Sequence, residues 1–335
     1  MRRDNTHSPT LAWLCRRLPQ LMPVVVGMAL LNFLILQLAP GDVVDVLAGE
    51  SGAATPETMA ALRARYGLDQ PLWQQLLAYL QQVVTLDLGW SYRQNMPVAQ
   101  LIATRLPPTL LLMGTALLVA VTAGTALGVL SARHVGRWPD QVVSVGVLFS
   151  FAMPSFWIGL VALMLFSAKL GWLPSGGMVS VVNDPRGWQR LLDIGRHTVL
   201  PALTLSSVYL AVYTKLVRTA MLELHGAEFI RVARAKGASA WRVTVHHALR
   251  NALLPLVTMV GLQVASLLSG AVLVETVFAW PGLGRLAYEA VQARDLNLLL
   301  GILLASSVLV VLINLMVDGL YTLLDPRVEL AGGQA

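Results

Sequence analysis

The sequence predicts an all-α integral membrane protein with six transmembrane helices. Of its 335 residues, 56% are hydrophobic and only 13% are charged, whereas a globular chain has about 25% charged residues. Two soluble domains of this combined length would need far more charge to cover their surfaces, and a disordered chain would need much lower hydrophobicity. Six segments are apolar enough to cross a bilayer core of about 30 Å, which takes roughly 20 residues of helix.

The six predicted spans alternate with polar segments that set their orientation. The spans comprise residues 20–39, 109–132, 141–166, 198–217, 252–278 and 297–320. Because the basic residues are denser in the segments that include both termini, the positive-inside rule predicts cytoplasmic termini. The net charge of +6 therefore fits membrane orientation better than nucleic-acid binding. Segment 166–197 fits this rule least well, because its basic residues Lys169, Arg186, Arg190 and Arg196 lie outside.

The first outside loop, residues 40–108, is predicted to contain two helices. Thr55 is suited to cap the first, with Pro56 at its first position and Gly67 closing it. The second is amphipathic, with an apolar face formed by Leu72, Leu76, Leu80 and Val83. Two interpretations remain open: the second helix lies on the bilayer or on neighbouring spans, or it forms a lid over a substrate path.

The second and third spans carry packing signals. Small residues recur every four positions in the second span, at Ala116, Ala120, Gly124, Gly128 and Ala132. Such a stripe, with its GxxxG pair at Gly124 and Gly128, lets another helix approach closely, and the partner could belong to this chain or another. In the third span, Pro154 is expected to kink the helix.

Few residues suggest chemistry within the chain. The single cysteine, Cys15, excludes an internal disulfide framework, and neither a catalytic constellation nor a metal-binding cluster is apparent. No lysine is followed by Ser or Thr, so the chain lacks a P-loop for ATP. The spans contain very few ionisable residues. Glu275 and Asp318 lie near span ends, where both are expected to reach interfacial water. An ion-coupled secondary transporter would bury more charge.

The inside loop 218–250 is the most distinctive segment. A helix from Glu228 to Lys236 is predicted to end at Gly237, which suits a left-handed turn, and Ser239 is suited to cap a further helix. The first helix carries Phe229, Val232 and Ala233 on one side and Arg231, Arg234 and Lys236 on others. The loop could simply follow the positive-inside rule. We favour a docking site, because two partly apolar helices in a loop expose surface suited to a partner.

At this loop the sequence resembles the permease subunits of bacterial ATP-binding-cassette importers, whose cytoplasmic EAA-type loop has a fixed Gly and a later Leu-Pro. The counterparts are RVARAKG (231–237) and LLP (253–255). Further stretches resemble the peptide/nickel branch, of the dipeptide and oligopeptide permease B type: PGD (40–42), GLDQP (67–71), LDLG (86–89), ETVFAWPGLGR (275–285) and VDGLYTLLDPR (317–327). The similarity runs from Pro19 to Arg327. Arg231 and Val232 depart from the Glu and Ala of the general pattern.

The resemblance implies the type I importer permease fold and a multi-pass location in the bacterial inner membrane. The transmembrane domain would comprise residues 20–327, between a cytoplasmic segment 1–19 and a tail 328–335. Its implied ATPase-docking residues are Glu228, Phe229, Arg231, Val232, Ala233, Arg234, Ala235, Lys236 and Gly237.

The same resemblance implies a multi-subunit machine. The partners would be a second homologous permease, two ATP-binding subunits that hold ATP-Mg, and a periplasmic or lipid-anchored substrate-binding protein, while this chain itself holds no cofactor. The expected cargo is peptides, with nickel or a metal chelate as the alternative within the family. An ion-coupled secondary transporter is the alternative from another class.

Overall fold

The computed structural model describes residues 9–38, 44, 55–65, 68–85, 87–91, 93–180, 186–224 and 226–324. The chain divides into two compact units. The first contains residues 1–103 and 290–311, and the second contains residues 104–289 and 312–335. Two long helices, α5 (Val98–Arg133) and α13 (Leu296–Leu324), contribute residues to both units.

In the part of the chain that the structure describes, the first unit also contains three further helices and a short hairpin. These elements are α1 (Pro9–Leu38), α3 (Pro56–Arg65), α4 (Leu72–Val84), β1 (Trp90–Ser91) and β2 (Met96–Pro97). The two strands pair antiparallel, with Trp90 opposite Pro97. The hydroxyl of Ser91 donates to the Asp295 carboxylate, and the Asn32 amide donates to the Leu300 carbonyl oxygen at 3.2 Å. These bonds attach α1 and the hairpin to the start of α13.

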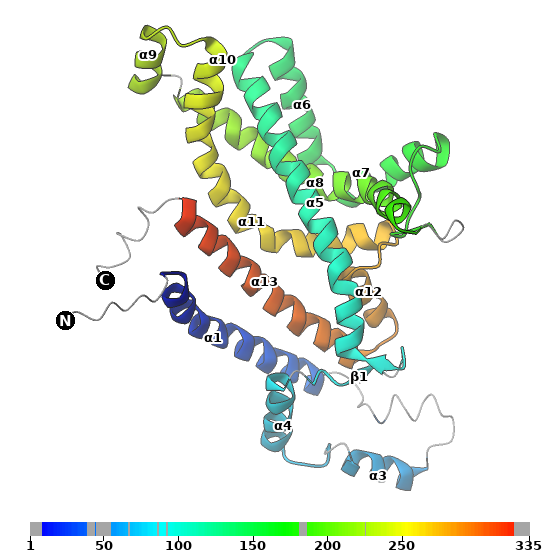
Figure 1. Ribbon diagram of the computed structural model, residues 1–335. Helices are drawn as coiled ribbons and strands as arrows, with labels where there is room; N and C mark the ends of the chain where they lie inside the picture. Colours follow the sequence, from blue (N-terminus) through cyan, green and yellow to red (C-terminus); the bar gives the residue numbers. More distant parts are fainter. Residues whose placement is uncertain are drawn as a thin grey trace, which may run out of the picture. The chain divides into compact units, whose positions relative to one another are not determined.

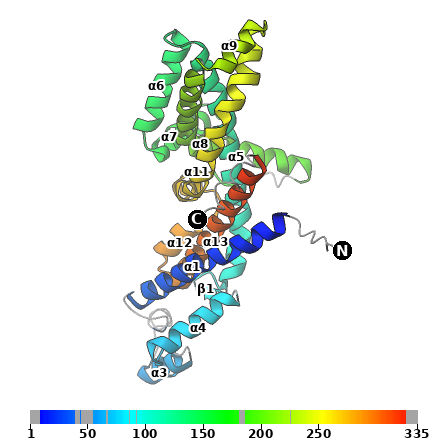
Figure 2. The same ribbon diagram turned by 90° about the vertical axis from the view of Figure 1, so that its left-hand side faces the viewer.

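The two helices predicted in the outside loop are present. The backbone N–H of Thr58 donates to the Thr55 hydroxyl at 3.3 Å, so Thr55 caps α3 as expected; the predicted closing residue, Gly67, lies outside the described residues. Helix α4 packs against α1, with the rings of Phe33 and Tyr79 6.1 Å apart (Figures 1 and 2). This contact supports the interpretation that α4 lies on a neighbouring span.

The second unit is built around α8. Its elements are α6 (Trp138–Ala152), α7 (Ser155–Ala162), the π-helix η1 (Leu163–Lys169), α8 (Trp188–Leu224), α9 (Glu228–Ala235), α10 (Ala240–Arg242), the π-helix η2 (Val243–Leu249), α11 (Arg250–Val277) and α12 (Leu283–Gln292). Helix α8 contacts α6, α7 and α11. Helices α9 and α10 lie at the same end of this unit as the turn between α5 and α6 (Figures 1 and 2).

The small-residue stripe of α5 packs against α8 of the same chain. All five stripe residues are buried. A Cβ atom added at Gly124 would lie 3.0 Å from the Tyr213 Cβ, and one added at Gly128 would lie 2.8 Å from the Thr214 carbonyl oxygen. The sequence left open whether the partner helix was internal, and the structure places this close approach within the chain.

Four helices in the described ranges are long and apolar enough to cross a membrane: α5, α8, Pro255–Val277 of α11 and Leu296–Val317 of α13. The segments 138–152 and 155–169 would add a fifth if they form one span, but they meet at 108°. The predicted first span falls in α1, whose described apolar stretch is Val25–Ile35. The count of six spans therefore stays a prediction.

The third span shows a sharper feature than the kink predicted at Pro154. Helix α6 ends at Ala152, the backbones of Met153 and Pro154 are extended, and α7 begins at Ser155. Proline has no N–H to donate and its ring crowds the preceding turn, and the residue before proline avoids the helical region. The helix is therefore broken rather than bent.

Candidate functional site

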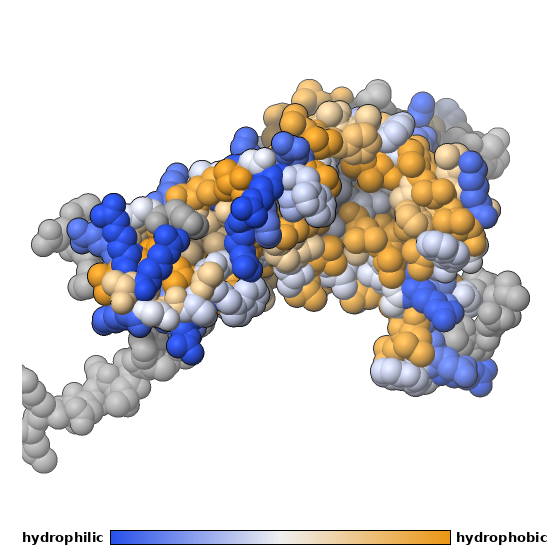
Figure 3. Space-filling model, turned by 90° about the horizontal axis from the view of Figure 1, so that it is seen from above, coloured by the Kyte–Doolittle hydropathy of each residue, from blue (hydrophilic) through white to orange (hydrophobic). Residues whose placement is uncertain are grey.

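The loop between α8 and α11 forms a groove of about 600 Å³. Its lining residues are Glu228, Phe229, Val232, Ala233, Lys236, Gly237, Ala238, Arg242 and His247. Figure 3 looks onto the end that carries this loop and shows hydrophilic side chains in several clusters on an otherwise largely apolar surface. The groove thus combines apolar side chains with charged ones of both signs.

Helix α9 is anchored on one side and exposed on the other. Ile230 and Ala233 are buried against α8, η2 and the start of α11, whereas Phe229 and Val232 are 41% and 51% exposed. Sequence reasoning placed Phe229, Val232 and Ala233 together on one side. All three line the groove, and Ala233 also belongs to the buried cluster beneath α9. The grouping missed Ile230, which is buried in that cluster. The spacing of Ile230 and Ala233, three residues apart on a helix, was the signal for this inner face.

The turn after α9 depends on Gly237. Its φ is +79°, and a Cβ added there would meet nothing within 4 Å, so backbone conformation rather than space requires glycine. The N–H groups of Gly237 and Ala238 donate to the carbonyls of Arg234 (2.9 Å) and Ala233 (3.1 Å), which closes the helix. Ser239 then caps α10, because its hydroxyl accepts from the Arg242 N–H at 3.4 Å.

The structure brings most of the predicted docking residues together. Six of the nine line the groove: Glu228, Phe229, Val232, Ala233, Lys236 and Gly237. The other three, Arg231, Arg234 and Ala235, are exposed elsewhere on α9. Sequence reasoning missed the lining residues Ala238, Arg242 and His247, which border the groove only because η2 folds back beside α9.

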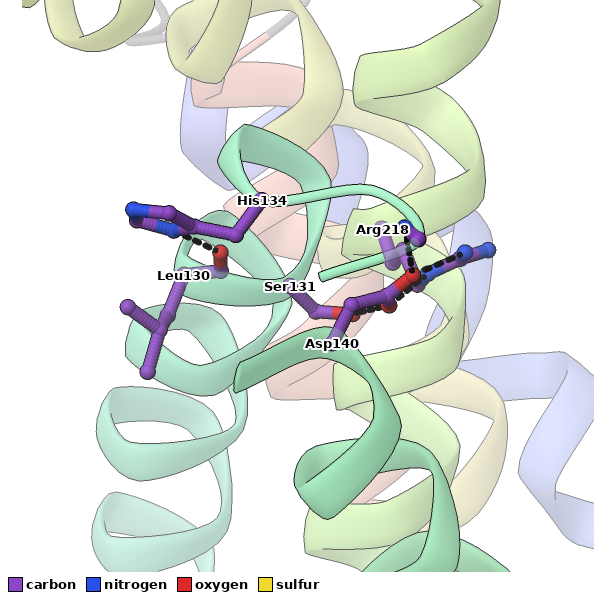
Figure 4. Close-up of polar contacts among 6 residues, drawn as sticks. Leu130, Ser131, His134, Asp140 and Arg218 are labelled. Carbon is purple, nitrogen blue, oxygen red and sulfur yellow. Dashed lines mark hydrogen bonds and ion pairs between the residues drawn. The ribbon is translucent and has the colours of Figure 1, made fainter. Parts of the chain in front are cut away.

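A charged cluster fixes the end of α8 that leads into this loop. The Arg218 guanidinium donates to both Asp140 oxygens, at 2.9 and 3.0 Å, and to the Ser131 hydroxyl at 3.0 Å. Ser131 in turn donates to Asp140, and the Gly136 N–H donates at 3.0 Å (Figure 4). These donors, Arg218 first, hold the pKa of the Asp140 carboxyl well below its usual range. The α5–α6 turn is therefore attached to the last turns of α8.

At the other end of α11, Glu275 is fully buried. Its carboxylate accepts from the Thr109 hydroxyl at 2.7 Å and the Arg285 N–H at 3.0 Å, and Thr109 accepts from the Leu283 N–H at 2.8 Å. The expectation that Glu275 reaches interfacial water was wrong, because the start of α12 folds over it. The side chain of Asp318, the other such residue, lies outside the described residues.

Comparison with known proteins identifies the family. Residues 124–330 match the family described as binding-protein-dependent transport system inner membrane component, and residues 10–113 match its N-terminal counterpart. The chain belongs to this family. It is a multi-pass protein of the inner membrane, and its family is one of transport-system membrane components.

Relatives of this permease cover it almost completely. It is 39% identical to the dipeptide transport system permease protein DppB of Escherichia coli K12, over 95% of this chain and 99% of that protein. It is 40% identical, with the same coverage, to a protein of Brucella suis biovar 1 provisionally named as a peptide transport system permease.

A solved structure shows the same fold. The inward-facing MetNI methionine ABC transporter matches with a TM-score of 0.54 and 19% identity, over 68% of this chain and 97% of that chain. The permease therefore has the fold of an ABC importer membrane subunit.

Proposed function

We propose that this chain is the membrane-spanning permease subunit of an ATP-driven importer that carries peptides across the inner membrane. The observation that carries the proposal is the full-length identity of 39–40% to relatives named for dipeptide and peptide transport. Those names favour peptides over the nickel or metal-chelate alternative. Family membership argues against an ion-coupled secondary transporter.

In the proposed assembly, the α9 groove docks an ATPase subunit at the cytoplasmic face. Two such subunits would hold ATP-Mg, a second homologous permease would complete the path, and a periplasmic or lipid-anchored binding protein would deliver the peptide. This arrangement requires six spans with both termini and loop 218–250 in the cytoplasm. The exposed Phe229 and Val232 supply apolar contact area for the ATPase, and Glu228, Lys236 and Arg242 supply charge around it.

The packing of α9 explains how docking would drive transport. Ile230 and Ala233 bury α9 in the same cluster as residues of α8 and α11, and α8 and α11 also contact each other directly. Because a packed cluster of this kind transmits displacement rather than absorbing it, movement of α9 with the ATPases would shift both spans. The central path would then switch between inward and outward access.

Substitution of Gly237 tests the proposal. Gly237→Val forces a β-branched residue into a left-handed backbone, which costs about 1–3 kcal/mol, so α9 docks poorly while every span stays unchanged. We expect the variant to insert normally and transport to fall about tenfold or more. ATP hydrolysis by the assembled complex should lose its stimulation by loaded binding protein.

Gly226→Val is the matched control, because Gly226 lies in the same loop, has open space around it and has no left-handed backbone. It should transport as the wild type does. Wild-type transport by Gly237→Val, or full transport by this chain without any ATPase subunit, would overturn the proposal.

A further inference from the structure

The first turns of α8 present an exposed apolar face. Trp188, Leu191 and Leu192 are all more than half exposed, and their spacing of three and four residues puts them on one side of the helix. The same face continues along α8 through Val199 and Leu203, which are also exposed although they belong to the predicted span 198–217. The apolar side thus extends from the segment before the span into the span itself, with Gly195 and the exposed Arg196 between Leu192 and Val199.

The length of α8 places this face at the membrane boundary. The helix has 37 residues and is therefore about 55 Å long, whereas a bilayer is about 30 Å thick in its core and 40–45 Å with its headgroups. Counted from residue 198, Leu192 lies about 9 Å and Trp188 about 15 Å further along the axis. Pro201 lies inside the helix, where a proline permits the first turns to incline towards the membrane plane. The headgroup layer is about 5–7.5 Å deep on each side, so these turns lie in it when they incline towards the membrane plane, as Pro201 permits.

Basic side chains surround the apolar face. Arg190 is exposed on another side of the same turns, Arg196 is exposed on the apolar side between Leu192 and Val199, and Lys169 is exposed at the end of η1. The acidic Asp193 is turned inwards, where it accepts from the Ser180 N–H at 2.6 Å and the Ser180 hydroxyl at 2.8 Å. The charge left on the surface of these turns is thus positive.

We propose that residues 188–197 bind anionic phospholipid. Trp188, Leu191 and Leu192 enter the boundary between headgroups and acyl chains, as tryptophan and apolar residues of interfacial helices do, while Arg190 and Arg196 pair with lipid phosphates. A lipid fits this surface because exposed arginines, which suit phosphate, lie beside apolar side chains that extend into a predicted span. The proposal also explains why basic residues occur in a segment where the positive-inside rule disfavours them.

The lipid-binding proposal requires only that the chain lies in a membrane, and the proposed topology decides only which leaflet is involved. A direct measurement of bound lipid therefore tests this proposal independently of the proposed transport function. We would purify the complete complex and measure bound phosphatidylglycerol by native mass spectrometry, with phosphatidylcholine as the neutral probe. Arg190→Gln and Arg196→Gln should each reduce retention of phosphatidylglycerol about fivefold, with no change for phosphatidylcholine.

Arg63→Gln is the matched control, since Arg63 is a partly exposed arginine of α3, on the same proposed side of the membrane but on a helix without an apolar face. It should retain phosphatidylglycerol as the wild type does. Equal retention in all variants would overturn the charge pairing.

A second measurement tests burial of the apolar face. The fluorescence of Trp188, taken as the difference between wild type and Trp188→Phe, should be quenched in nanodiscs by lipids brominated near the headgroup end of the acyl chain. If no brominated lipid quenches Trp188, or if Trp188 becomes shielded only when the binding protein is added, the face is not a lipid site.

Discussion

Asp140 is a buried carboxylate whose full set of donors comes from three separate segments. Arg218 lies on α8, Ser131 on α5 and Gly136 in the turn between α5 and α6. A buried charge is stable only when it is paired and hydrogen-bonded, and Asp140 meets that requirement. The pair therefore stabilises one arrangement of the ends of α5, α6 and α8.

Substitution of this residue has a predictable pH dependence. Asp140→Asn should lower the free energy of unfolding by about 1.5–3 kcal/mol at pH 7, the range for hydrogen bonds to charged groups. Because the folded-state pKa of Asp140 is lowered, its contribution is complete above the unfolded pKa of about 3.9 and is lost as the pH falls through the folded value. The difference between wild type and variant should therefore shrink as the pH falls below about 5.

Thermal unfolding of the purified protein across this pH range checks the prediction. Asp69→Asn, at an exposed carboxylate, serves as the control and should change stability little. A difference for Asp140→Asn that stays constant down to pH 4 and below would contradict the assignment.

The contact between α5 and α8 sets the separation of two predicted spans. Gly128 meets backbone at the position of a Cβ atom, whereas Gly114, on the same helix, has nothing within 4 Å. Neither glycine has a positive φ. A comparison of the same substitution at Gly114 and Gly128 therefore measures the effect of steric crowding, because backbone conformation is not a factor at either position.

Replacement of these glycines should give opposite signs. Gly114→Ala should leave stability unchanged or raise it by up to about 1 kcal/mol, since alanine is the better helix former. Gly128→Ala should lower it by about 1–3 kcal/mol through overpacking. Thermal unfolding of the purified variants measures both effects on stability. Equal effects at Gly114 and Gly128 would show that α5 and α8 do not approach as closely as described.

Local signals in the sequence predicted several elements well. The caps at Thr55 and Ser239 and the left-handed Gly237 depend only on neighbouring residues, so the sequence was sufficient to find them. The Asp140–Arg218 pair joins residues 78 positions apart and the Thr109–Glu275 bond joins residues 166 apart. Such contacts depend on which helices become neighbours, and no local periodicity encodes that.

At the scale of the whole molecule, the sequence predicted the helical membrane class, which the structure and the family confirm, whereas docking at loop 218–250 stays a prediction. The sequence overestimated the regularity of the spans, because hydropathy alone does not distinguish a continuous helix from two helices that meet at 108° around Met153 and Pro154. The length of an apolar segment indicates how many residues can lie in lipid. It does not indicate whether those residues form one straight helix.

The proposed topology can be tested with single cysteines in a Cys15→Ser background. Cysteines placed within loop 218–250 should resist impermeant thiol reagents in intact cells, because the membrane separates them from the reagent. Cysteines near Thr58 or Arg186 should react. Cells opened with detergent are the control for protection by a docked ATPase, and labelling of loop 218–250 from outside would reverse the orientation.

The burial of Glu275 constrains how this region can change by mutation. A Cβ added at Gly282 would overlap the Glu275 carboxylate, and one added at Gly284 would lie 2.5 Å from the Val272 Cα. Shortening Glu275 would make room at Gly282, but it would remove the acceptor of the Arg285 N–H and the nearer of the two acceptors of the Thr109 hydroxyl. Each single substitution at Glu275, Gly282 or Gly284 is therefore expected to destabilise the fold. These positions can vary only when several of them change together. The sequence of the α11–α12 junction is therefore difficult to change by one substitution at a time.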